Sequence, residues 1–425
     1  MRVVILTRNF PPRSCGVGDC ACRLAETLAA AGTEVMVLTE PAEAQKEFPF
    51  ALRELPLSGW SSFRPLLAAI EQAAPDCVQL EYAGYAWSRW GTPWWLNALL
   101  FALRRKKIAV HVGLHETAIR MRQHPLQISV ALAQWVHIGL LLGAAESVAV
   151  NMPSRVTLLG RVFPWWRARL CYRPNPSNIP VVPLAPAERS ALRRDRGVGS
   201  GEAVVATFGM FHRAKNYQAV IEAVKILRAA LPVKLWMLGD VAMAAPDYRA
   251  QLEALVREAG MESDVWWSGR LEAEEVSRAL QAADVFVLPQ ADGHLTRSGA
   301  FMAAAAHGLP VVAVRNPAGR DQQEFTHGES VWLVERSAAE PIAAALRILV
   351  EDPAVAGLLG RNLRRLYEAK FDWSQAIGKL GANTEIRNIA RPGDKRHGSE
   401  GAGEPRPHRA RERAAAAAPV SGAKS

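Results

Sequence analysis

Short apolar runs alternate with longer amphipathic stretches along most of the chain. Five runs in the first half are rich in β-branched residues and short enough to be buried strands: 3–7, 34–38, 77–82, 108–114 and 147–151. Stretches with helical spacing lie between them, for example 19–31 and 93–106. This alternation predicts an α/β fold in which helices cover both faces of a parallel sheet.

The alternation stops at residues 172–183, where prolines and short polar residues predict a hinge. It restarts with strands at 203–208, 233–238, 265–268, 285–289 and 310–314, and with helices at 217–230, 248–259, 274–283 and 299–307. We therefore predict two Rossmann-like domains that face each other across a cleft. The first covers residues 1–180, the second covers residues 181–372, and residues 373–390 form a helical segment that can pack back onto the first.

Three further segments have distinctive composition. From residue 391 to 425, Pro, Gly, Arg and a run of alanines predict a disordered basic tail, with eight Lys or Arg against four Asp or Glu. Residues 128–145 approach the length of a membrane span, but Gln134 and His137 interrupt the apolar run and favour a buried helix. The apolar stretch at the N-terminus is too short for a signal peptide, so we expect a cytoplasmic protein.

Charge and cysteine content narrow the function classes. The formal net charge of +10 suggests an anionic partner, but a large part of the excess lies in the predicted tail, which disfavours nucleic-acid binding. The five cysteines are sparse and odd in number, unlike a disulfide framework. Cys15, Cys20 and Cys22 lie close together without a fourth ligand at a standard spacing, so we expect no metal and no cofactor.

Residues directly after strands are the candidates for ligand contact, because ligands bind beyond the carboxyl ends of strands in parallel sheets. After the first strand, Gly16 and Gly18 stand near the start of a helix, whose N-terminus attracts anions. Asp19 follows them and is assigned to the acceptor side, with a simple helix N-cap as the alternative.

A second loop follows the first strand of the second domain and carries Gly209, Arg213 and Lys215. A lysine ammonium or an arginine guanidinium suits the charge that develops on a departing diphosphate. The alternative is a solvated basic loop.

A third loop follows the fourth strand of the second domain and opens an alanine-rich helix. It contains Asp292 and Gly293, and then Arg297, Ser298 and Gly299 at the helix start. This arrangement suits an anion-binding site, and it suits an ordinary capped helix equally well.

Strand ends in the first domain supply further polar side chains. His115 and Glu116 follow the strand at 108–114, where a histidine can hydrogen bond to a substrate or serve a purely structural role. Glu81 and Tyr82 end the preceding strand and are assigned, with Glu116, to the acceptor side.

A tryptophan-rich segment precedes a basic cluster. Trp87, Trp90, Trp94 and Trp95 are followed by an apolar helix that ends in Arg and Lys at residues 104–107. Such a helix suits the surface of a membrane, and it suits a half-buried core position at least as well.

Together these motifs resemble those of the group 1 transferases of glycosyltransferase family 4, which have the GT-B fold. The likeness extends from about residue 1 to residue 385, and the segments that carry it include 177–180, 215–216, 283–289, 307–313 and 327–334. The resemblance implies transfer of a hexose-type sugar, with retention of configuration, from a nucleoside diphosphate donor to an acceptor held by the first domain. It also implies that Lys215 binds the diphosphate.

The sequence departs from the family pattern at the donor loop. The usual Glu-x7-Glu pair is replaced by Leu295 and Ala303, and the usual arginine after the glycine is replaced by Met210. One branch of the family is similar to this chain in having Asp-Gly followed by a Ser/Arg-rich helix start, here residues 292–293 and 297–298.

We therefore expect a metal-independent glycosyltransferase in which Lys215 and Arg213 stabilise the departing diphosphate. His115 would orient the sugar or the acceptor, and the loop at 16–18 would close over the ligand. The acceptor is unknown; a lipid-linked one, with peripheral contact to the inner face of the membrane, would fit glycolipid or surface polysaccharide synthesis.

Two alternatives belong to other function classes. A catalytically inactive GT-B protein that binds a nucleotide sugar or a protein partner would follow from the missing glutamates. A nicotinamide-dependent oxidoreductase is disfavoured, because the first glycine pattern differs and the second strand is not followed directly by an acid.

Overall fold

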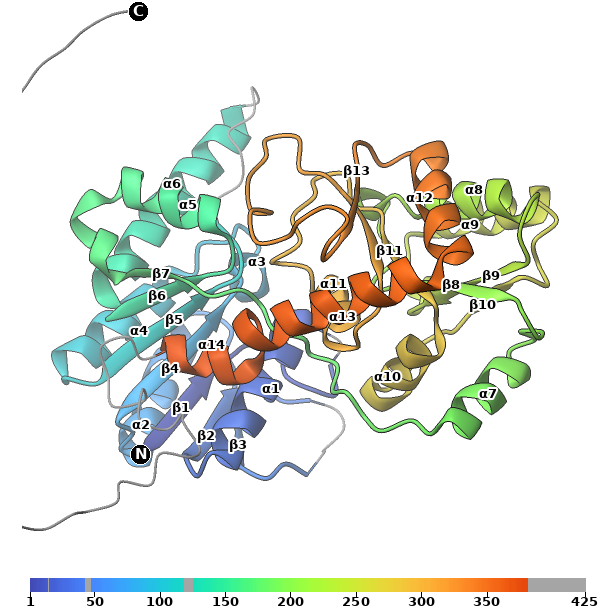
Figure 1. Ribbon diagram of the computed structural model, residues 1–425. Helices are drawn as coiled ribbons and strands as arrows, with labels where there is room; N and C mark the ends of the chain where they lie inside the picture. The colour runs from blue at the N-terminus through green and yellow to red at the C-terminus, as the bar shows by residue number, and fades with distance from the viewer. Residues whose placement is uncertain (14, 43–46, 118–124, 381–425) are drawn as a thin grey trace, which may run out of the picture. The chain divides into compact units, whose positions relative to one another are not determined.

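The computed structural model describes residues 1–13, 15–42, 47–117 and 125–380. The described residues form one compact unit, whereas residues 381–390 of the predicted helical segment and the predicted tail at 391–425 lie outside them. Two parallel sheets with helices on both faces dominate the fold (Figure 1), which confirms the α/β class.

The first sheet has seven strands in the order β3-β2-β1-β4-β5-β6-β7. The strands are β1 (Arg2–Leu6), β2 (Glu34–Thr39), β3 (Ala51–Glu54), β4 (Cys77–Tyr82), β5 (Ala109–Leu114), β6 (Ser147–Val150) and β7 (Leu170–Tyr172). The accompanying helices are α1 (Gly16–Ala30), η1 (Trp60–Ser62), α2 (Phe63–Ala73), α3 (Gly84–Trp87), α4 (Trp94–Arg105), α5 (Pro125–Ala144), α6 (Pro153–Val162) and η2 (Pro164–Arg169).

The second sheet has six strands in the order β10-β9-β8-β11-β12-β13. The strands are β8 (Ala203–Phe208), β9 (Val233–Leu238), β10 (Val265–Trp267), β11 (Val285–Leu288), β12 (Val311–Val314) and β13 (Trp332–Val334). The accompanying helices are α7 (Pro186–Asp195), η3 (Arg213–Lys215), α8 (Tyr217–Arg228), η4 (Val241–Met243), α9 (Pro246–Glu258), α10 (Ala273–Ala282), α11 (Gly299–Ala306), α12 (Ala339–Glu351) and α13 (Pro353–Lys370). The last helix, α14 (Trp373–Leu380), contacts α1 and so belongs with the first sheet.

Both sheets share one topology. The strand order reverses beside the first strand of each sheet, so that β1 pairs with β2 and β4, and β8 pairs with β9 and β11. This is the order of a Rossmann fold, which opens a crevice at the carboxyl ends of the two strands that flank the reversal. The loops after β1, β4, β8 and β11 therefore occupy the positions where ligands bind in such sheets.

Alternate residues of each strand fill separate cores on the two faces of its sheet. In the first sheet, Val4 lies in the core under α2, α4 and α5, whereas Val3 lies in the core under α1. Strands covered on both faces are apolar throughout, which is why they were recognised as continuous runs. Trp373 of α14 joins the core under α1, and its Nε1 donates to the Ser177 carbonyl oxygen at 2.7 Å. The domain boundaries as such remain a prediction.

All ten predicted strands are present, whereas three short strands were not predicted. β3, β7 and β13 have four, three and three residues, and each lies at the edge of its sheet. The side chains of β3 and β7 are partly or fully exposed, whereas β13 buries Leu333 and Val334 and leaves Trp332 partly exposed. An edge strand pairs on one side only and needs no continuous apolar run, so its sequence carries little signal.

Two expectations about helices need correction. α5 forms where a buried helix was predicted, but one of its faces is exposed, with Leu132 and Val136 at 52% and 58%. The Trp-rich segment provides no continuous tryptophan surface, because Trp87 and Trp95 are buried and α4 is a core helix. Its basic end remains exposed.

Candidate functional site

The loop after β8 brings Lys215 over the end of that strand. Gly209 directly follows β8 with φ +124°, a conformation that favours glycine. A Cβ atom at this position would lie only 2.6 Å from Lys215 Nζ. Glycine at position 209 therefore makes room for the lysine ammonium at the carboxyl end of β8.

The charge of Lys215 has no ionic partner within the described part of the chain. Burial lowers the pKa of its ammonium to about 8. A cation that is partly removed from water and unpaired is stabilised by an incoming anion, which would restore the lost solvation. The geometry thus favours the predicted ligand contact, which itself remains a prediction.

Arg213 does not accompany Lys215. Its Nη2 forms an ion pair with Asp247 of α9 at 2.5 Å, and its guanidinium lies 5.1 Å from the ring centre of Tyr248. Arg213 was expected to share in diphosphate binding, but in this structure its charge is already matched. Of the two cations, only Lys215 has its charge available at the strand end.

The third predicted loop is held together by its own side chains. Asp292 forms an ion pair with Arg297, and Ser298 Oγ accepts a hydrogen bond from Phe301 N at 3.3 Å, as the N-cap of α11. Gly293 has φ +60°, and a Cβ atom there would lie 2.5 Å from Asn316 N. The capped-helix interpretation therefore holds for Ser298, and an additional anion-binding role for the loop stays a prediction.

Gly299 and Gly16 open their helices beside free space. A Cβ atom at either position would have no neighbour within 4 Å among the described residues. Gly18 differs, because a Cβ atom there would lie 2.6 Å from the Asn9 carbonyl oxygen, so this glycine allows α1 to pack against the loop after β1. The helix begins at Gly16 with Cys15 as its N-cap residue, which rules out the alternative that Asp19 is the N-cap. Burial raises the pKa of Asp19 to about 6.

The first domain contains a buried ionic cluster around Glu81. Its carboxylate, on β4, accepts hydrogen bonds from His115 Nε2 at 2.5 Å, Arg173 Nη2 at 3.1 Å and Gln79 Nε2 at 2.8 Å. Gly113 lies opposite Glu81 in the register of β4 and β5, and a Cβ atom there would be 2.3 Å from the carboxylate. The three donors come from β4, from the end of β5 and from the end of β7.

These contacts fix the ionisation state of Glu81. Burial alone would raise the pKa of its carboxyl group, but Arg173, His115 and Gln79 outweigh burial and lower it to about 2. The carboxylate is therefore charged at neutral pH and holds the proton of His115 on Nε2. Because Nε2 faces Glu81, the hydrogen bond fixes the orientation of the His115 ring and leaves Nδ1 for other contacts.

Cys20, Glu81 and His115 approach the arrangement of a metal site. One ligand atom of each lies within 4.8 Å of the others. However, Arg173 already neutralises the carboxylate, and burial raises the pKa of the Cys20 thiol, whereas a metal requires the thiolate. The donor set therefore does not fit a metal ion. No disulfide bond joins the five cysteines.

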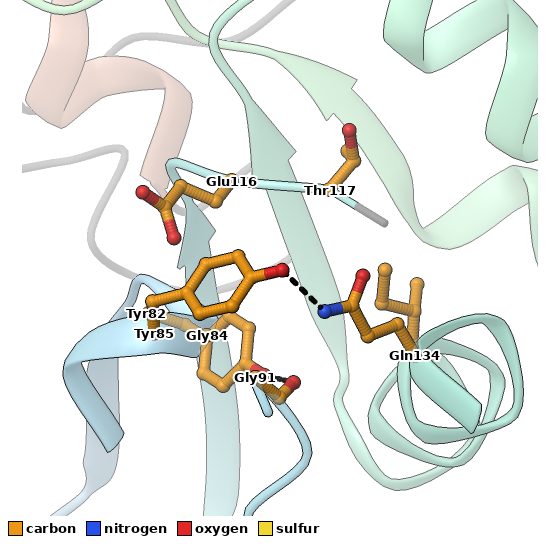
Figure 2. Close-up of a pocket in the computed structure, with 8 residues that line it drawn as sticks. Tyr82, Gly84, Tyr85, Gly91, Glu116, Thr117 and Gln134 are labelled. Carbon is orange, nitrogen blue, oxygen red and sulfur yellow. Dashed lines mark hydrogen bonds between the residues drawn. The ribbon is translucent and has the colours of Figure 1, made fainter. Parts of the chain in front are cut away.

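Beside this cluster lies a small pocket (Figure 2). It is lined by residues of β4, α3, the loop between α3 and α4, α5 and the segment after β5: Tyr82, Gly84, Tyr85, Gly91, Glu116, Thr117, Gln134 and Ile138. Tyr82 Oη donates to the Gly91 carbonyl oxygen at 3.2 Å, and Gln134 Nε2 donates to Tyr85 Oη at 3.0 Å. The structure thus brings Tyr82 and Glu116 together, whereas Glu81 belongs to the cluster with His115.

Three residues of this region, Arg173, Gln134 and Tyr85, were not predicted from the sequence. Arg173 stands in the proline-rich hinge segment, where no pattern indicated a buried side chain, yet it is only 7% exposed. Gln134 stands out in the sequence only as an interruption of an apolar run, and Tyr85 was not predicted as a site residue. A buried polar residue within an apolar helix was the one available signal, because such a residue usually has a hydrogen-bond partner.

Comparisons with known proteins agree with this architecture. Residues 202–352 match the family model "Glycosyl transferases group 1". A D-inositol 3-phosphate glycosyltransferase from Pseudarthrobacter chlorophenolicus is 31% identical over 191 residues, which are 44% of this chain and 43% of that protein. An alpha-maltose-1-phosphate synthase from Mycobacterium tuberculosis is 23% identical over 390 residues, which are 88% of this chain and 96% of that protein.

Solved structures match over nearly the whole described chain. The Anabaena protein Alr3699/HepE, crystallised with UDP and glucose, has a TM-score of 0.66 and 18% identity, covering 89% of this chain and 98% of its own. At this identity the likeness shows the fold alone. The chain spans about half the length of the first curated relatives, 43% and 52%. Residues 202–352 are thus similar to the group 1 glycosyltransferases, and the two-sheet architecture is shared with solved structures of glycosyltransferases.

Proposed function

We propose that the chain transfers a hexose from a nucleoside diphosphate sugar to an acceptor bound by the first domain, without a metal and with retention of configuration. The observation that carries the proposal is the unpaired Lys215 ammonium above Gly209, at the carboxyl end of β8. It stands in the segment that matches the group 1 family. A fixed positive charge at that point stabilises the negative charge that develops on the leaving diphosphate.

On the acceptor side, His115 and the small pocket supply the polar contacts. Glu81 holds His115 in one orientation, so that Nδ1 can accept a hydrogen bond from a sugar or acceptor hydroxyl. Tyr82 and Glu116 line the pocket next to it. A lipid-linked acceptor, in glycolipid or surface polysaccharide synthesis at the inner face of the membrane, fits relatives such as a phosphatidylinositol monomannoside mannosyltransferase of Corynebacterium glutamicum.

The test is calorimetric titration of the full chain with UDP-, GDP-, ADP- and dTDP-sugars. We expect one nucleotide to bind selectively and Lys215→Ala to weaken its affinity by at least about tenfold, because a charge-assisted contact contributes roughly 1.5–3 kcal/mol. Lys225→Ala is the matched control, since Lys225 is an exposed lysine on α8. Equal affinity in the wild type and both variants would refute the role of Lys215.

A second candidate is a catalytically inactive GT-B protein that binds a nucleotide sugar or a protein partner. Leu295 and Ala303, which replace the family's two glutamates, are both fully buried in the apolar core of the second sheet. Neither position therefore offers a carboxylate to a donor. Stoichiometric donor binding without consumption, in the presence of lipid-linked and soluble acceptors, would favour this candidate.

A further inference from the structure

The outward face of α5 is apolar and is not covered by any described residue. Four side chains at successive intervals of four residues are between 37% and 58% exposed: Ile128, Leu132, Val136 and Leu140. By length and composition alone, Leu126–Ala144 could cross a membrane. However, its other face packs into the core of the first sheet, where Asn97 Nδ2 donates to His137 Nδ1 at 2.8 Å. The helix therefore lies along the domain and offers one face outward.

The segment after α6 extends this apolar surface. Phe163 and Trp166 pack against α5, because a Cβ atom at Gly139 would lie 2.8 Å from the Phe163 ring and one at Gly143 would lie 3.0 Å from the Trp166 ring. Trp165 contacts Trp166 edge to face and is 70% exposed.

α6 itself adds two exposed apolar side chains, Leu158 and Val162, which stand one helical turn apart. We call the following set the α5 patch: Ile128, Leu132, Val136, Leu140, Leu158, Val162 and Trp165. Patches of this kind on a folded domain mark sites of association with another molecule or with a membrane.

The charges around the α5 patch indicate what covers it. Arg161 on α6 and Arg167 on η2 are exposed, and neither has an ionic partner among the described residues. Glu146 is the only acidic residue in the sequence from 125 to 172. Exposed apolar side chains, an exposed tryptophan and two arginines without a described ionic partner, all on the adjoining elements α5, α6 and η2, complement the boundary between acyl chains and anionic headgroups.

We infer that the α5 patch docks the first domain flat on an anionic lipid bilayer. Leu132 and Val136 enter the outer acyl region, Trp165 lies at the level of the headgroups, and Arg161 and Arg167 face lipid phosphates. This inference deepens the proposed function. It rests on that function in one respect, which is that the acceptor is linked to a lipid.

The test is cosedimentation of the full chain with phosphatidylcholine vesicles, with and without phosphatidylglycerol. We expect binding that requires phosphatidylglycerol, and an affinity reduced about tenfold or more in the double variant Leu132→Ser/Val136→Ser, because removing exposed aliphatic carbons removes their transfer free energy. The matched control is Ile226→Ser/Leu358→Ser, on α8 and α13, whose side chains are 46% and 51% exposed. This control should bind vesicles like the wild type.

Arg161→Gln/Arg167→Gln should reduce the dependence on phosphatidylglycerol several-fold while leaving the folded structure unchanged by circular dichroism. Equal binding by the α5 variant and the control overturns the inference. The inference is also overturned if the wild type is a dimer in sedimentation velocity and the variant Leu132→Ser/Val136→Ser is a monomer, because the α5 patch then joins two copies of the chain. Calorimetric titration with the donor is done without lipid, so its result does not depend on vesicle binding. Vesicle binding without donor binding would refute the proposed function and leave the inference about the α5 patch intact.

Discussion

Removing the positive partner of Glu81 should strongly destabilise the first domain. Arg173→Met deletes the guanidinium that lies 3.1 Å from the fully buried carboxylate. The carboxylate would then be left charged without its cation, which costs about 3–5 kcal/mol in buried pairs. The pKa of Glu81 gives a similar magnitude: a fall from 4.5 to about 2 corresponds to about 3 kcal/mol.

The assay is urea and thermal unfolding of the wild type, Arg173→Met and the double variant Glu81→Gln/Arg173→Met at pH 7. The single variant should lose about 10 °C in Tm, at roughly 2–4 °C per kcal/mol for a domain of this size. The double variant should recover most of the loss, because a neutral amide leaves no buried charge. A loss below about 1 kcal/mol in the single variant, or equal losses in both, would refute the reasoning.

The lowered pKa of Glu81 also predicts that the stability of the fold depends on pH. Because the folded pKa of Glu81 is lower than its unfolded value, its contribution to stability is complete above about pH 4.5 and is lost as the pH falls towards 2. Urea midpoints measured from pH 7 down to pH 3 should therefore fall more steeply in the wild type than in the double variant. Parallel curves would contradict this assignment.

Three further predictions concern other parts of the chain. Donor affinity should weaken as the pH rises from 7 to 9, because the pKa of Lys215 is about 8 and the neutral amine no longer attracts a diphosphate; calorimetry on Lys215→Ala should show no such dependence. Gly209→Ala should lower donor affinity about tenfold by displacing the ammonium, whereas Gly197→Ala, also at positive φ but with no neighbour within 4 Å, should leave it unchanged. Burial lowers the pKa of His137 to about 4. Its contribution to stability should therefore be lost as the pH falls from about 6.5 towards 4. In His137→Gln, the urea midpoint should depend less on pH over that range.

Part of the candidate site could be predicted from the chain alone. The strand pattern predicted that Gly209 and Lys215 lie at the end of β8, because a strand end and its following glycine are local features. That these residues bind a ligand stays a prediction. The matched charge of Arg213 could not be predicted, since its partner Asp247 lies on another helix. Likewise, nothing local indicated that Arg173 reaches Glu81, which is 92 residues away in the sequence.

The sequence by itself determined the α/β class, ten of the thirteen strands in the described residues and the alternation of strands and helices in both sheets. Those features follow from local periodicity, because a buried parallel strand must be apolar on both faces. Only the tertiary structure decided the edge strands β3, β7 and β13, the buried cluster around Glu81 and the exposed face of α5. Each of these depends on which distant segment covers a given side chain, and a helix that is apolar all round, such as α5, carries no pattern that says which of its faces the core will leave uncovered.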